Sequence, residues 1–328
     1  MRNRKRILTL EDKQNILFVV NPRSGVQKKY KITDLIEKHL DKEKYNLYIE
    51  YTQRVGDAGK IAKSAVERGG IDVVVAVGGD GTVNEVGAAI IHTNIALGVI
   101  PCGSGNGFAR HLGLPLDPVK AIEFINTSSV VCVDYGTLNG RPFFCACGVG
   151  FDAVVSNNFA SSSNRGLLGY VQNTLLELAK YKPEQYEVEA YNVTRHYKAF
   201  MIACGNASQY GNNAYIAPHA SMRDGLLNVS ILKPFLPMEA PMIANQLFNN
   251  NIDSNDRVVT LSVPWIRITR KAPGPVHYDG EPCMMEANLE IKVVPSGLNV
   301  LAHKGWDGTC APMPIYRQFY DVIAGNVK

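Results

Sequence analysis

The sequence predicts an α/β protein with a β-rich second half, an architecture of the α/β plus β class. The first 135 residues alternate short, nearly continuous apolar runs with stretches whose apolar residues repeat every three to four positions. Strands that are apolar on both faces and joined by helices are typical of a parallel sheet covered on both sides. After about residue 130, short strand-like runs recur with turn residues between them. A length of 328 residues favours two domains.

The first half is expected to alternate strand and helix. Strands are predicted at 15–20, 45–51, 71–77 and 95–100, and helices at 32–40, 58–66, 83–91 and 118–125. The last of these helices has a clear start, because Asp117 is a good N-cap and Pro118 suits the first helical position. This order predicts a parallel sheet with helices on both faces.

The second half is expected to form an antiparallel sandwich or open barrel. Strands are predicted at 130–133, 142–147, 186–191, 199–204, 226–232, 258–263, 265–269 and 289–294. Helices are predicted at 167–181, at 238–248 and within the last 25 residues. The rhythm changes near Asp134, which we take as the domain boundary.

Composition excludes several classes of protein. With 46% hydrophobic and 20% charged residues, the chain is neither disordered nor collagen-like. Its longest apolar runs are strand-sized, well short of the roughly 20 residues of a membrane helix. A net charge of +4 does not require nucleic acid and permits weak attraction to an anionic membrane. The seven cysteines are scattered without a CxxC pair, and no export signal is evident, so we expect a cytoplasmic protein without disulfides or zinc.

Glycine-rich loops follow three of the first four predicted strands. They are Asn21–Gly25 (NPRSG), Gly78–Thr82 (GGDGT) and Pro101–Gly107 (PCGSGNG). Ligands of open parallel sheets bind beyond the carboxyl ends of the strands. Glycine lets backbone N–H groups approach an anion, and a helix N-terminus adds partial positive charge. One such loop is usually only a turn, but three on one edge predict a phosphate site. The chain has neither a P-loop nor a dinucleotide fingerprint.

Asp80 lies within this predicted phosphate site. A carboxylate beside phosphates is repelled unless a cation lies between them, so Asp80 indicates a magnesium-bound nucleotide or a base near the γ-phosphate. The alternative is that Asp80 caps the helix that follows.

The three loops, in this order, resemble those of the diacylglycerol kinase and sphingosine kinase catalytic family. NAD kinases share the GGDGT loop but differ in the other two segments. The resemblance continues in Asp224-Gly-Leu226 and Asp279-Gly-Glu281. It implies a nucleotide-binding α/β domain with a parallel sheet at 13–134, a β-sandwich-like lipid-binding domain at 135–300, and a segment at 301–328 that packs back on the first domain.

The resemblance also implies roles for individual residues. It implies a catalytic acidic group of Asp80, Asp279 and Glu281, and leaves open which of them accepts the proton. It implies a magnesium site at Asp224, with backbone carbonyls from Ser221 and Leu226. The nucleotide-binding residues would be Asn21, Ser24, Gly25, Thr52, Gly78, Gly79, Gly81, Thr82, Asn84, Glu85, Ser104 and Asn106. Without the family context, Asp224-Gly225 and Asp279-Gly280 are simply predicted turns.

One position departs from the family pattern. Bacterial diacylglycerol kinases usually have aspartate where this chain has Gly107, and its GSGN loop is more similar to the sphingosine kinase and long-chain-base branch. We therefore expect an ATP- and Mg²⁺-dependent kinase for a sphingoid base or a diacylglycerol, in peripheral contact with the membrane and without nucleic acid. A homodimer through an edge strand stays open. The alternatives are a soluble-substrate kinase of the NAD kinase type and a catalytically silent lipid- or nucleotide-binding protein.

Overall fold

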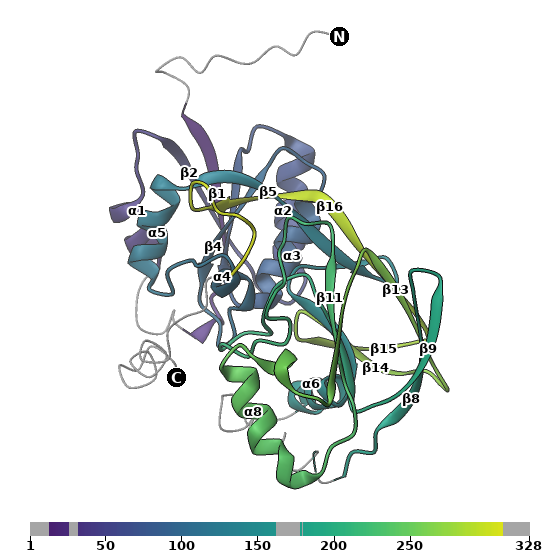
Figure 1. Cartoon of the computed structure of the whole chain (residues 1–328). Helices are drawn as coiled ribbons and strands as arrows, with labels where there is room; N and C mark the ends of the chain where they lie inside the picture. Colours follow the sequence, from purple (N-terminus) through teal and green to yellow (C-terminus); the bar gives the residue numbers. More distant parts are fainter. Residues whose placement is uncertain (1–12, 26–31, 162–177, 179, 311–328) are drawn as a thin grey trace.

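The computed structural model describes residues 13–25, 32–161, 178 and 180–310. Its first half is the predicted α/β layer structure (Figure 1). Four parallel strands lie in the order β2-β1-β3-β4: β1 (Gln14–Val20), β2 (Tyr45–Tyr51), β3 (Val73–Gly78) and β4 (Ala96–Pro101). The helices are α1 (Ile32–His39), α2 (Asp57–Arg68), α3 (Asp80–Ile90), α4 (Gly107–His111) and α5 (Pro118–Thr127).

Both faces of this parallel sheet are covered, as the apolar strands predicted. Alternate residues of β1 point to opposite sides: Leu17 and Val19 join the core cluster under α2 and α3, whereas Ile16 and Phe18 join the cluster under α1 and α5. The predicted start of α5 is confirmed, because the Asp117 side chain accepts a hydrogen bond from the backbone N–H of Lys120.

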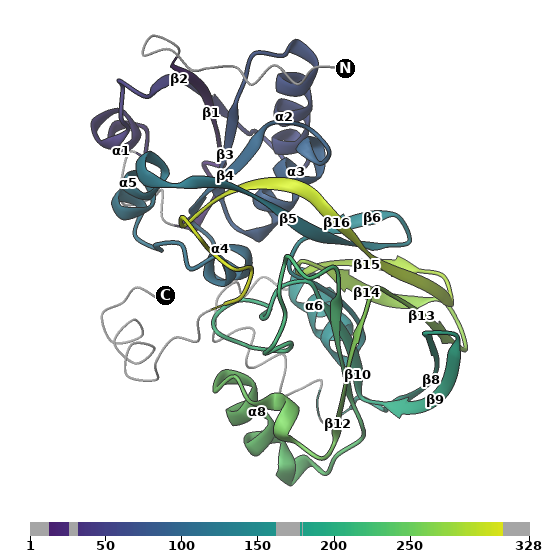
Figure 2. The same cartoon turned by 45° about the horizontal axis from the view of Figure 1, so that its top comes forward.

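The second half contains an antiparallel sheet of six strands, in the order β12-β11-β10-β7-β14-β15 (Figure 2). They are β7 (Ala146–Gly150), β10 (Met201–Gly205), β11 (Leu227–Leu232), β12 (Val258–Val263), β14 (Gly274–Tyr278) and β15 (Glu281–Met285). Helical segments flank this sheet: α6 (Phe151–Ser161), η2 (Pro237–Glu239), α8 (Ala240–Phe248) and η3 (Ile252–Ser254).

The remaining strands extend the first sheet to ten strands. They are β5 (Ser129–Leu138), β6 (Arg141–Phe143), β8 (Glu184–Ala190), β9 (Val193–Ala199), β13 (Trp265–Arg270) and β16 (Asn288–Ala302). A single apolar cluster fills the space between this extension and the six-stranded sheet, with Ile266 and Leu289 on one side and Val149 and Ile202 on the other. The predicted sandwich-like second half is therefore confirmed.

β16 belongs to both halves of the molecule. It pairs antiparallel with β13 and β5 and parallel with β4 at Asn299 and Val300. The sequence predicted only 289–294, because Pro295-Ser-Gly297 is typical of a turn. In the structure that tripeptide is an irregularity inside one long strand, with Ser296 at a positive φ of 51°. Its N–H donates to Asp134 Oδ1 at 2.7 Å, so a buried carboxylate on β5 holds the irregularity in place.

Other elements were not predicted, namely α6, β9, β14 and β15. Most of the predicted helix at 167–181, and the predicted closing helix, lie outside the described residues. The described part of the segment after β16 contacts the first half: the ring centroids of His303 and Phe124 are 4.6 Å apart, and His111 Nε2 lies 3.0 Å from the carbonyl oxygen of Gly308. No helix within the described ranges is both long enough and apolar enough to cross a membrane.

Candidate active site

The loops after β3 and β4 touch backbone to backbone. The Cys102 N–H donates to the Gly78 carbonyl at 2.7 Å. A Cβ atom on Gly103 would lie 2.6 Å from the Cα of Gly79, a distance that no side chain tolerates. Glycine is therefore required at this contact, which brings two of the predicted phosphate loops onto one edge of the sheet.

The loop after β1 joins the same edge. Asn21 Nδ2 donates to Thr82 Oγ1 at 3.3 Å, and Asn21 Oδ1 accepts the Arg23 N–H at 3.0 Å. Ser24 donates its N–H to the Asn21 carbonyl, and Gly25 lies near the Cys102 carbonyl. Thr52 is also here, because its N–H donates to the Val20 carbonyl at the end of β1.

Asn106 shapes the GSGN loop from within. It has a positive φ of 52°, its Oδ1 accepts the Gly103 N–H at 2.9 Å, and its Nδ2 donates to the Gly103 carbonyl at 2.8 Å. Its side chain is thus engaged by its own loop. Ser104 is exposed at the tip of that loop.

Glu85 points away from the glycine-rich loops, toward the start of α2. One carboxylate oxygen accepts the N–H of Gly56 at 2.8 Å, and the other accepts those of Ala58 at 3.1 Å and Gly59 at 3.3 Å. These are N–H groups that the first turn of a helix leaves without intrahelical partners. In this structure Glu85 is a capping residue for α2.

The side chain of Asp279 is fixed by hydrogen bonds to both of its carboxylate oxygens. It forms the β14–β15 turn with Gly280, and both have positive φ values, 47° and 82°, as a two-residue hairpin turn requires. The predicted hairpin turn is therefore present. Both carboxylate oxygens are occupied by hydrogen-bond donors, namely the backbone N–H groups of Phe144, Cys145 and Ala146 and the Nδ2 of Asn84. Burial raises the pKa of Asp279, and these donors oppose that shift.

Asp80 is the first residue of α3, but its side chain makes no cap on that helix. Its Oδ2 lies against Gly105 of the GSGN loop, where a Cβ atom would be 2.9 Å away. Burial and the charge of Asp279 raise the pKa of Asp80 to about 6, against the opposing N–H groups of Asn106, Phe108 and Gly107. Its Oδ1 is buried and has no hydrogen-bond partner among the described residues. The capping alternative is therefore wrong, and Asp80 places a buried oxygen without a described hydrogen-bond partner where the glycine-rich loops meet.

Glu281 completes an acidic group. Its Oε1 lies 3.0 Å from where a Cβ on Gly81 would be, so the carboxylate borders the start of α3. Burial raises the pKa of Glu281, and the charges of Glu85 and Asp279 raise it further. Carboxylates that repel one another in this way fit a site that a cation or a proton neutralises.

The predicted metal residues lie beside β5. Asp224 Oδ1 accepts the Leu226 N–H at 3.0 Å, and Ser221 Oγ accepts the Arg223 N–H at 3.3 Å. Burial raises the pKa of Asp224, and the nearby Asp134 adds to this. Asp134 is itself occupied, since its Oδ2 accepts the Gly225 N–H at 2.8 Å. Within the described ranges, no three His, Cys, Asp or Glu side chains are arranged to hold a metal ion.

The sequence reasoning missed a buried polar group next to the acidic residues. Asp152 Oδ2 accepts the Tyr210 hydroxyl at 2.8 Å and lies 2.9 Å from His277 Nε2. Asp152 is the second residue of α6, which follows the strand end Gly148-Val-Gly150 directly, so the pattern of glycine, strand end and polar residue could have found it. His277 is buried.

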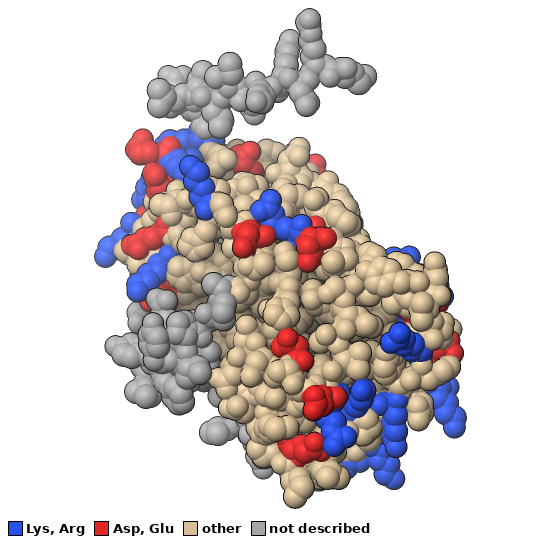
Figure 3. Space-filling view, viewed as in Figure 1, with Lys and Arg blue, Asp and Glu red and all other residues tan. Residues whose placement is uncertain are grey.

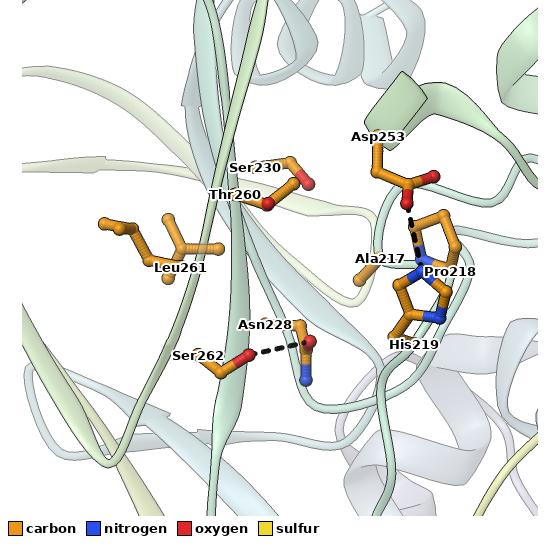
Figure 4. Close-up of a pocket in the computed structure, with 10 residues that line it drawn as sticks. Ala217, Pro218, His219, Asn228, Ser230, Asp253, Thr260, Leu261 and Ser262 are labelled. Carbon is orange, nitrogen blue, oxygen red and sulfur yellow. Dashed lines mark hydrogen bonds and ion pairs between the residues drawn. The ribbon is translucent and has the colours of Figure 1, made fainter. Parts of the chain in front are cut away.

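A small pocket between β11 and β12 lies away from these residues (Figure 4). It is bordered by an ion pair between His219 and Asp253, at 3.0 Å. None of the predicted site residues lines this pocket, and we assign no function to it.

Comparison with known proteins agrees with this geometry. Residues 15–138 match the model of the diacylglycerol kinase catalytic domain, and residues 145–302 match the YegS C-terminal NAD kinase beta sandwich-like domain. A "Probable lipid kinase YegS-like" from Chromohalobacter salexigens is 34% identical over 268 residues, covering 80% of this chain and 85% of the relative.

A second protein of that description, from Pseudomonas aeruginosa, is 27% identical and covers 88% of this chain and 94% of its own. The crystal structure of a diacylglycerol kinase from Bacillus anthracis has the same fold, with a TM-score of 0.69 at 18% identity, over 88% of this chain and 97% of that one. The chain therefore belongs to the lipid kinase family that joins a diacylglycerol kinase catalytic domain to a YegS-type C-terminal domain.

Proposed function

We propose that this protein transfers the γ-phosphoryl group of ATP to the hydroxyl of a membrane lipid, either a sphingoid base or a diacylglycerol. The observation that carries the proposal is the Oδ1 of Asp80, which is buried where glycine-rich loops converge and has no hydrogen-bond partner in the described part of the chain. Membership of the lipid kinase family supports the same reading.

The glycine-rich loops supply the phosphate site. Their backbones approach closely at the glycines, and α3 begins at Asp80 within the GGDGT segment, so a helix N-terminus lies at this edge of the sheet. Bound Mg²⁺ would neutralise the developing phosphoryl charge. Glu281 is the residue that would hold it, because this carboxylate borders Gly81 and is repelled by Glu85 and Asp279.

Asp80 is better placed than Asp279 to accept the proton. The acceptor oxygen forms its bond to phosphorus as its proton moves to a carboxylate and the bond between phosphorus and ADP breaks. Both oxygens of Asp279 accept hydrogen bonds, whereas Oδ1 of Asp80 accepts none from the residues that the structure describes. A pKa of about 6 also leaves Asp80 mostly ionised at neutral pH while keeping it a useful base.

Aromatic residues of one buried core cluster connect the neighbourhood of Asp152 to the η2–α8 end of the molecule. Phe151, the neighbour of Asp152, stacks on Phe200 with ring centroids 4.5 Å apart, and Phe200 contacts Phe235 at 4.6 Å. Leu236 and Met238, one and three residues after Phe235, are 59% and 80% exposed. We propose that these exposed apolar side chains at the η2–α8 end of the molecule touch the membrane that holds the lipid substrate.

Charge supports this orientation. Figure 3 shows basic side chains gathered at the lower right of one face, at the end of the molecule that carries β8 and β9. Arg195 and Lys198 of β9 are exposed. Exposed apolar residues with basic residues at the same end favour a weak, peripheral contact with an anionic bilayer.

A radiolabel transfer assay tests the proposal. Protein, [γ-³²P]ATP and Mg²⁺ are mixed with micelles that contain sphingosine, dihydrosphingosine or diacylglycerol, and NAD serves as the soluble alternative. Label on a lipid supports the proposal and identifies the acceptor. Label on NAD alone, or on none of the acceptors with ATP binding intact, contradicts it. Asp80→Asn is the matched inactive control.

A further inference from the structure

A short segment of the second half docks on the GSGN loop of the first. We call Tyr210–Asn213 the docking segment. A Cβ atom on Gly211 would lie 2.8 Å from the Cα of Gly105, so these two backbones also touch. The Asn212 N–H donates to the Gly105 carbonyl at 3.0 Å. Gly211, Asn212 and Asn213 all have positive φ values, of 124°, 50° and 62°. This conformation is suited to glycine and asparagine, and it lets the segment lie flat on the loop.

Gly107 is part of the same contact. A Cβ atom at this position would lie 3.0 Å from the carbonyl oxygen of Tyr210 and 3.1 Å from its carbonyl carbon. The docking segment therefore occupies the space that a side chain at position 107 would need. Glycine at position 107 therefore allows the docking segment to lie against the GSGN loop.

Arg110 joins the docking segment and the loop through its side chain. Its Nε donates to the Gly105 carbonyl at 3.0 Å, and its Nη1 donates to Asn213 Oδ1 at 3.0 Å. The residue is buried. Its guanidinium therefore spans the docking segment and the loop.

The other end of the docking segment is anchored in the second half. The Tyr210 hydroxyl donates to Asp152 Oδ2 at 2.8 Å, and the same oxygen lies 2.9 Å from His277 Nε2. The Tyr210 and His277 rings are also in contact, with centroids 5.5 Å apart. His277 lies on β14, two residues before Asp279. The contacts thus run from the β14–β15 hairpin through Asp152 and Tyr210 to the GSGN loop.

We infer that Tyr210 is a positioning residue, whose bond to Asp152 fixes the docking segment and, through it, the GSGN loop for nucleotide binding. The inference rests on the proposed function. Gly105 is the contact point for both the docking segment and Asp80 Oδ2. A displaced segment would move the loop and the carboxylate together, and small displacements of reacting groups are costly.

The experiment compares Tyr210→Phe with Tyr191→Phe. Both substitutions remove one hydroxyl that donates at 2.8 Å, but Tyr191 donates to the Ser262 carbonyl beside the β8–β9 turn. Binding of a fluorescent ATP analogue and the KM values for ATP and for the lipid are measured. We expect Tyr210→Phe to weaken analogue binding and kcat/KM for ATP by about tenfold, the scale of one hydrogen bond to a charged group. The lipid KM should not change, and Tyr191→Phe should behave as wild type.

Several results would overturn the inference. A lower melting temperature with unchanged kinetics per folded molecule would make Tyr210 purely structural. A change in the lipid KM alone would make it an acceptor-binding residue. If Tyr210→Phe does not fold, Asn213→Ala removes the bond to Arg110 at the other end and should weaken analogue binding about threefold.

Analogue binding also separates this inference from the proposed function. Wild-type protein that binds the analogue and labels no lipid contradicts the proposed function, while the effect of Tyr210→Phe on binding still tests the positioning role. Wild-type protein that does not bind the analogue contradicts both.

Discussion

Asp80 and Asp279 belong to one acidic group, yet replacing each by asparagine should change stability in opposite directions. In Asp279→Asn, one oxygen becomes an NH₂ group that faces two of the hydrogen-bond donors now bound to the carboxylate. Each buried donor left without an acceptor costs about 1–3 kcal/mol, or about 2–6 kcal/mol for the two. Removing the buried charge offsets part of this, so we expect a net loss of at least about 2 kcal/mol.

Asp80→Asn should instead stabilise the fold. Its folded pKa is about 6, raised from 3.8 chiefly by burial. A difference of about two units corresponds to about 3 kcal/mol of destabilisation by the ionised group at pH 7. Asparagine keeps an oxygen that can accept from the N–H groups of the GSGN loop and removes the charge, so we expect a gain of about 1–3 kcal/mol.

The stability difference between Asp80→Asn and the wild type should depend on pH. Because the folded pKa of Asp80 lies above its unfolded value, the folded state binds more protons between about pH 4 and 6, and wild-type stability falls as pH rises through that window. The advantage of Asp80→Asn should therefore be largest above about pH 6 and vanish below about pH 4. Urea unfolding of the wild type and both variants at pH 4 and pH 7.5 measures these differences. Equal destabilisation by both substitutions, or a stable Asp279→Asn, would refute the reasoning.

Three further outcomes follow from the site. The kcat of the wild type should rise with pH through about 6, because Asp80 accepts a proton only when ionised. Asp80→Asn should lower kcat by about 10²–10⁴-fold. A kcat that does not change with pH would exclude Asp80 as the base. Glu85→Ala should lower the free energy of unfolding by about 1–2 kcal/mol, because α2 loses its cap. The affinity for ATP should not change. A selective loss of ATP affinity would instead place Glu85 in the nucleotide site. Chelation by EDTA should abolish transfer without altering the circular dichroism spectrum, and Mg²⁺ should restore it; transfer that persists in EDTA argues against a metal requirement.

Local patterns were sufficient for the first half of the fold. The strands of the parallel sheet are apolar on both faces, and Asp117-Pro118 marks a helix start through chemistry confined to a few residues. The second half depended more on distant contacts. Pro295-Ser-Gly297 is typical of a turn in the sequence, and it stays within β16 because Asp134, far away in the chain, accepts the Ser296 N–H.

In the candidate site, too, one part could be predicted from local sequence and another part could not. The glycine-rich loops could be located from the sequence because strand ends of a parallel sheet share one edge, and the structure brings them into contact. The roles of the acidic residues could not. Whether a carboxylate oxygen is occupied depends on hydrogen-bond donors elsewhere in the chain. The oxygens of Asp279 accept hydrogen bonds from Asn84 and from the backbone N–H groups of 144–146.

Gly107 shows why a departure from a family pattern has to be interpreted in three dimensions. In the sequence, the missing aspartate weakens the assignment to diacylglycerol kinases and keeps a silent protein possible. In the structure, the position is filled by the backbone of Tyr210, and Arg110 ties that segment to the GSGN loop. An aspartate at position 107 would have to displace the docking segment. With glycine there, the docking segment and Arg110 hold the GSGN loop. Asp80 is retained, and among the described residues its Oδ1 has no hydrogen-bond partner, which supports the proposed role of this carboxylate as the base.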